Sequence, residues 1–191
     1  MEYTTGHEIS PFYKLPHQLA LKLVEGLTDE QVAWKANADT PSIGFHLWHL
    51  ARWTDDLQAI IADRLPQVGV SPNLWETEGY AARWNLDPAQ LGEQQTGQML
   101  EGDAANIPLP DKEAILAYAR RALSAADEIA EKVDELFRQL QDPDDESDEK
   151  TRKTILGARR AIIDFMGHDN RHLGMMEGLK GVLTGKGTAT V

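Results

Sequence analysis

The sequence predicts an all-α protein. Two observations support this prediction: four segments carry apolar residues at helical spacing, and most of these segments begin or end at helix-capping or helix-breaking residues. The first segment covers residues 11–25 and ends before Gly26. Its apolar stripe consists of Phe12, Leu15, Leu19 and Leu23.

The second predicted helix covers residues 42–64. Asp39, Thr40 and Pro41 precede it as a cap followed by a proline that the first turn of a helix tolerates, and Pro66 follows it. Its apolar positions form one stripe, which consists of Ile43, Leu47, Leu50, Leu57 and Ile61.

The third and fourth predicted helices cover residues 110–140 and 151–180. The third is long and amphipathic, with its apolar face at Ile115, Tyr118, Ala122, Ile129, Val133, Leu136 and Leu140. The acidic run 142–149 separates the two helices and is expected to be a solvated, flexible loop, because blocks of like charge stay hydrated. The glycine- and threonine-rich tail 181–191 has no strong helical signal and is expected to be flexible.

The connection between the second and third helices, residues 65–109, is long and contains Trp75, Tyr80 and Trp84. Connections of this length are uncommon unless they are functional or contain short elements of their own. Two interpretations remain open: these aromatic residues cap one end of the bundle, or they wall a pocket above a functional site.

Composition limits the class of protein. A chain of 191 residues is most simply one domain, here 1–191. A net charge of -12 argues against nucleic-acid binding, and no apolar run is long enough to span a membrane. The segment Met1–Glu8 lacks the features of a signal peptide, so a cytoplasmic location is expected. Because the chain has no cysteine, any metal must be held by imidazole, carboxylate or water.

Histidines supply the strongest functional signal. His168 and His172 are four residues apart, so they share one helix face, along a seam with Ala161, Phe165, Met175 and Leu179. One more imidazole from the second helix would complete a three-histidine metal site with open positions, which suits catalysis better than structure. His46 and His49 both lie near the buried side of that helix, and helical periodicity alone favours His46.

The segments Ser42-Ile43-Gly44-Phe45-His46-Leu47-Trp48-His49-Leu50-Ala51 and His168-Asp169-Asn170-Arg171-His172-Leu173-Gly174 resemble the DinB/YfiT-like metalloenzymes. This resemblance implies a four-helix bundle of up-down-down-up topology, often homodimeric, with a long link between helices two and three. It implies His49, His168 and His172 as ligands of a divalent metal, zinc or nickel, and makes His46 a packing residue or a neighbour of the ligands. Many members have a Gln shortly after the last histidine, whereas this chain has Met175 and Met176.

The resemblance favours an enzyme that activates a low-molecular-weight thiol (an S-transferase) or water (a hydrolase) for attack on a small molecule. Asp164 and Arg171 are the candidate catalytic residues. Asp169, Arg52 and Asp56 are further candidate helpers, and the alternative interpretation is that all five are surface charges in helical ion pairs. Trp48, Trp53, Met175 and Met176 are interpreted as packing residues.

Two alternatives to an enzyme remain open. The protein could be a non-catalytic metal-binding dimer that acts as a ligand-binding or stress-related interaction protein. It could also be a scaffold in which the histidines form a metal-free polar core.

Overall fold

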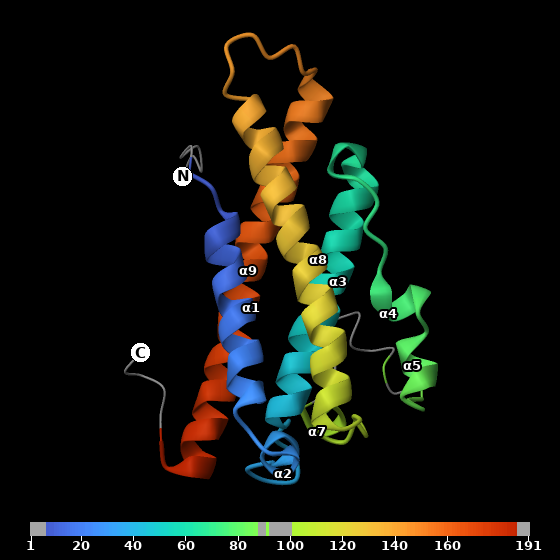
Figure 1. Cartoon of the computed structure of the whole chain (residues 1–191), viewed down its shortest axis with the longest axis vertical. Helices are drawn as coiled ribbons and strands as arrows, with labels where there is room; N and C mark the ends of the chain where they lie inside the picture. Colours follow the sequence, from blue (N-terminus) through green and yellow to red (C-terminus); the bar gives the residue numbers. More distant parts are fainter. Residues whose placement is uncertain (1–6, 88–90, 92–100, 187–191) are drawn as a thin grey trace.

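The computed structural model describes residues 7–87, 91 and 101–186, and within these ranges the regular structure is entirely helical. Four long helices dominate: α1 (Ser10–Glu25), α3 (Ile43–Arg64), α8 (Lys112–Gln139) and α9 (Glu149–Thr184). Figure 1 shows them side by side, with α1 and α9 running toward the bottom of the view and α3 and α8 toward the top. A short helix that the sequence did not predict, α2 (Asp29–Ala33), connects α1 to α3.

Side-chain caps begin three of the long helices. Ser42 accepts a hydrogen bond from the backbone N–H of Phe45, and Asp111 accepts one from Ala114. Asp148 caps α9 in the same way through Thr151. These bonds satisfy N–H groups that have no partner within the helix.

Helix α9 is longer at both ends than its sequence predicts. It includes Glu149, which belongs to the acidic run, because an acidic residue in the first turn interacts favourably with the helix dipole. At the other end the helix continues to Thr184, four residues into the expected tail, and stops at Gly185. Gly185 has φ of 68°, a left-handed conformation that favours glycine.

The expected apolar stripe of α1 is only partly correct. Phe12 and Leu15 are 66% and 53% exposed, whereas the neighbouring Tyr13 and His17 are each 1% exposed. The helix therefore buries a face offset from the expected one, which consists of Tyr13, Pro16, His17, Ala20, Leu23 and Val24. The buried face includes a histidine, His17, which has polar partners inside the bundle and which a pattern of apolar residues does not reveal.

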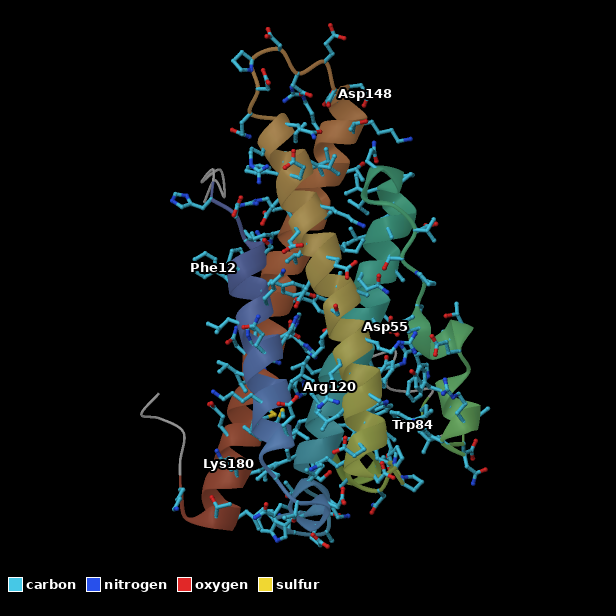
Figure 2. All side chains as sticks on the ribbon, viewed as in Figure 1. Phe12, Asp55, Trp84, Arg120, Asp148 and Lys180 are labelled. Carbon is cyan, nitrogen blue, oxygen red and sulfur yellow. The ribbon has the colours of Figure 1, made fainter. Side chains whose placement is uncertain are left out.

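The other stripes are buried as expected along α3 and for most positions of α8. Figure 2 shows side chains filling the spaces between the helices.

The core also contains a charged connection between helices. Asp134 of α8 accepts hydrogen bonds from Ile9 N and Ser10 N at the start of α1, at 2.9 and 2.8 Å, and from Arg159 of α9 at 2.7 Å. One buried carboxylate thus joins three helices.

The connection between α3 and α8 contains η1 (Pro66–Val68), α4 (Leu74–Thr77), α5 (Tyr80–Arg83) and α7 (Glu101–Ala105). In Figure 1, α4 and α5 lie beside α8. Trp75, Tyr80 and Trp84 pack against one another and against Tyr118 of α8, with ring centroids 4.7–5.9 Å apart. They therefore cover the side of the bundle instead of walling the histidine pocket.

A fully buried carboxylate anchors this connection. Asp55 of α3 accepts hydrogen bonds from Leu74 N at 3.0 Å, Trp75 N at 2.8 Å and the Tyr118 hydroxyl at 3.0 Å. Burial next to Asp55 raises the pKa of Tyr118 well above its ordinary value, so Tyr118 remains a hydrogen-bond donor. None of the helices described is both long enough and apolar enough to cross a lipid bilayer.

Candidate metal centre

Helices α3 and α9 bring three histidines together. His49 comes from α3, and His168 and His172 come from successive turns of α9. Each ring offers one nitrogen, and these three nitrogens all lie within 4.8 Å of one another. The ring centroids are 5.5 Å apart for His49–His168, 4.6 Å for His49–His172 and 4.5 Å for His168–His172. This is a cluster that could hold a single metal ion.

His46, the residue that helical periodicity favoured, lies beside the cluster. It is 6% exposed, and its Nδ1 lies 3.1 Å from Nδ1 of His172. A hydrogen bond between these nitrogens leaves Nε2 of His172 for an ion. Helical periodicity placed His46 correctly in the buried part of the helix, but the three-histidine cluster contains the half-buried His49.

Burial keeps two of these rings neutral. It lowers the pKa of His46 to about 4. Burial, followed by repulsion from the neighbouring histidines and Arg171, holds the pKa of His172 well below its ordinary value. Neutral imidazole is the form that binds metals, so His172 is ready to act as a ligand at neutral pH.

His168 has a different partner. Its Nδ1 lies 3.2 Å from Oδ1 of Asp169, whose side chain is completely buried. The other oxygen of Asp169 lies 3.3 Å from Nε2 of His17 on α1, and Nδ1 of His17 lies 2.7 Å from Oδ1 of Asp127 on α8. Burial opposes a charge on His17, but the two carboxylates outweigh that effect and raise its pKa to about 9.

The cluster opens into a pocket of about 840 Å³. His49, His168 and His172 line it together with His46, and its apolar walls include Phe45, Trp53, Phe165, Met175 and Leu179. Trp53 and Met175, which were interpreted as packing residues, lie in the pocket wall, whereas Trp48 and Met176 are core residues. The histidine seam of α9 therefore faces a pocket and not the centre of the bundle.

Comparison with known families gives a match over most of the chain. The DinB superfamily model matches residues 14–176, which include all the histidines of the pocket and the contacts behind His168. The chain belongs to the DinB superfamily. No curated protein matches it.

The two candidate catalytic residues of this DinB-superfamily chain lie at the edge of its pocket. Asp164 and Arg171 both line the pocket and are exposed. Asp164 forms an ion pair with Arg160 one turn earlier on α9, with both oxygens 2.9 Å from the guanidinium Nε. Their catalytic roles stay predictions.

The other predicted helpers do not line the pocket. Arg52 is buried over the ring of Trp75 and bonds Asp56 at 2.6 Å and Glu76 at 3.1 Å, so it holds the link between α3 and α8. Of the five helpers, Asp169 lies 3.2 Å from a histidine of the cluster, through its Oδ1 and Nδ1 of His168. Sequence reasoning missed His17, although its place four residues after Tyr13 and three before Ala20 could have marked a second face of α1.

Proposed function

We propose that this protein is a metal-dependent enzyme that holds a divalent ion, zinc or nickel, through His49, His168 and His172. The substrate would be a small molecule, attacked by a low-molecular-weight thiol or by water. The convergence of three histidine nitrogens within 4.8 Å at the wall of an apolar pocket carries the proposal. Sites with three protein ligands and an open side suit catalysis, whereas structural zinc sites are closed by a fourth ligand.

The residues present fit such an ion. Hydrogen bonds occupy Nδ1 of His168 and of His172, which leaves Nε2 of each ring as a potential ligand atom. A bound divalent ion would supply Lewis-acid chemistry, because it lowers the pKa of a coordinated thiol or water. The absence of cysteine in the chain means that the thiol would come from a cosubstrate.

The protein's other residues would bind and orient the reactants. Trp53, Phe165 and Met175 offer apolar surface for an organic electrophile. Arg171 offers a positive charge at the pocket edge, which suits a carboxylate on one of the reactants, because the planar guanidinium matches the geometry of a carboxylate. Asp164 would accept a proton during the reaction after its ion pair with Arg160 has opened.

The proposal extends to the whole protein. Residues 1–191 would form one DinB-like domain with up-down-down-up helix topology and a long link between the second and third long helices. The enzyme would act in the cytoplasm as a homodimer, without nucleic acid or membrane as a partner.

The experiment begins with metal content of protein purified without an affinity tag. We expect about one zinc or nickel ion per chain, lost in His172→Ala and retained in His7→Ala, because His7 is exposed and outside the pocket. Each protein is then incubated with monochlorobimane and bacillithiol, mycothiol or glutathione. Conjugation that requires both the metal and His172 supports thiol transfer.

Two results would contradict parts of the proposal. Protein without stoichiometric metal, whose stability does not respond to added zinc or nickel, would overturn the metal site. Metal binding without metal-dependent conjugation or ester hydrolysis would exclude both reactions and leave a non-catalytic metal-binding bundle.

A further inference from the structure

Asp169, His17 and Asp127 form a buried row of charged groups that contacts His168, one of the three clustered histidines. Asp169 is adjacent to His168 on α9, and its side chain is 0% exposed. It contacts His168 with one oxygen and His17 with the other. The proposed reaction does not use Asp169, His17 or Asp127, so their arrangement needs a separate explanation.

The chemistry of the partners determines where the protons lie. An ionised carboxylate only accepts hydrogen bonds, so the neighbouring imidazole nitrogens must donate. His168 therefore carries its proton on Nδ1, which leaves the Nε2 lone pair for a metal ion. His17 faces a carboxylate from each of its two nitrogens and must carry both protons.

The row also joins three helices. Asp169 belongs to α9, His17 to α1 and Asp127 to α8. A buried carboxylate such as that of Asp169 needs a partner of opposite charge, because burial disfavours its charged form. The imidazolium of His17 supplies the compensating charge, and Asp127, which is 17% exposed, fixes His17 from the other side.

We propose that Asp169 is a positioning residue that holds His168 in the ligand-competent tautomer, and that His17 and Asp127 hold Asp169 in place. The effect on metal affinity rests on the proposed metal site, whereas the effect on the tautomer does not. Carboxylates that hold a ligating histidine in this way contribute about 10- to 100-fold to metal affinity. The alternative is that the row merely connects three helices.

A second buried carboxylate in the same bundle provides the matched control. Asp134 is 3% exposed, pairs with a buried cation, Arg159, and also connects α1, α8 and α9. It contacts none of the clustered histidines. Asp134→Asn therefore reproduces the loss of a buried charge that joins helices without touching the proposed site.

The experiment uses the full chain and compares Asp169→Asn, His17→Gln and Asp134→Asn with the wild type. Zinc affinity is measured by competition with a chromogenic chelator, and proton–nitrogen correlation spectra of the metal-free proteins report the tautomer of His168. We expect Asp169→Asn to bind zinc about 10- to 100-fold more weakly and to show a mixture of His168 tautomers. We expect His17→Gln to change both readouts in the same direction and Asp134→Asn to change neither.

The outcomes separate this inference from the proposed function. An unchanged His168 tautomer and zinc affinity in folded Asp169→Asn, with a loss of stability like that of Asp134→Asn, would overturn the positioning role. A wild type that binds no zinc would overturn the metal site, and the tautomer would still decide the positioning role. If Asp169→Asn does not fold, His17→Gln and Asp127→Asn decide it by the same two readouts.

Discussion

Nδ1 of His46 lies 3.1 Å from Nδ1 of His172, so a hydrogen bond joins the buried His46 of α3 to one of the three clustered histidines. In that bond one ring must donate and the other accept, because both are neutral. If His172 ligates through Nε2, it is the donor. His46 is then a partner of a ligand and not a ligand itself.

This relationship predicts different results for the two histidines of α3. His46→Phe should keep one zinc ion per chain but bind it about 10- to 100-fold more weakly, because His172 loses its Nδ1 partner. His49→Phe should lose stoichiometric zinc, because it removes a member of the cluster. Metal content and chelator competition measure both variants. The opposite pattern, with zinc lost in His46→Phe and kept in His49→Phe, would make His46 the ligand.

The raised pKa of His17 predicts that the folded protein loses stability at alkaline pH. Its pKa is about 9 in the folded protein, compared with an ordinary value of 6.5, so the folded state binds a proton more tightly than the unfolded chain. The resulting stability, on the order of 3 kcal/mol, is fully present below about pH 6.5 and is lost as the pH rises through about 9.

Urea unfolding of the metal-free protein between neutral pH and pH 10 tests this. The difference in the free energy of unfolding between wild type and His17→Gln should shrink as the pH rises, and this subtraction removes the contributions of lysines and tyrosines. A difference that is independent of pH would show that His17 does not change its charge in this range.

Asp55 predicts the stability of the link between α3 and α8. Asp55→Ala removes the acceptor of Leu74 N, Trp75 N and the Tyr118 hydroxyl, and it should cost about 3 kcal/mol because buried donors are left without partners. Asp63→Ala, an exposed position on the same helix, should change the free energy of unfolding by less than about 0.5 kcal/mol. Equal effects of the two substitutions in urea unfolding would mean that Asp55 does not anchor the link.

Two adjacent residues of α1 test which face of that helix is buried. Tyr13→Ala should lower the free energy of unfolding by about 3–5 kcal/mol, because it empties a site that is 1% exposed. Phe12→Ala, at a site that is 66% exposed, should change it by less than about 0.5 kcal/mol. A large, concentration-dependent loss in Phe12→Ala would instead identify this side of α1 as an interface in the proposed homodimer.

The all-helical fold could be predicted because α3 and α8 each have an unambiguous apolar stripe, in which hydrophobicity and helical spacing agree. In α1 they disagree. Phe12 and Leu15 fit the spacing, but the buried face includes His17, whose charge is compensated by Asp127 and Asp169 from other helices. A pattern of apolar residues carries no information about such partners.

The candidate site could be predicted in the same partial way. Helical spacing placed His168 and His172 on one face, but periodicity favours the residue nearest the middle of the stripe and therefore selected His46. The cluster forms at the margin of the buried face, where the half-buried His49 meets the pocket. Only the family resemblance, which records where a site forms and not which face is most apolar, indicated that residue.

His168 and Asp169 are neighbours in sequence, yet one borders an open pocket while the other is sealed in the core. Successive side chains of a helix point roughly 100° apart, so a rotation of α9 about its axis would move His168 at the pocket and Asp169 in the core at once. Because His17 on the buried face of α1 contacts Asp169, substitutions on that face, which never meets a reactant, are expected to alter the chemistry of the pocket. Screens for altered activity should cover that helix as well as the pocket wall.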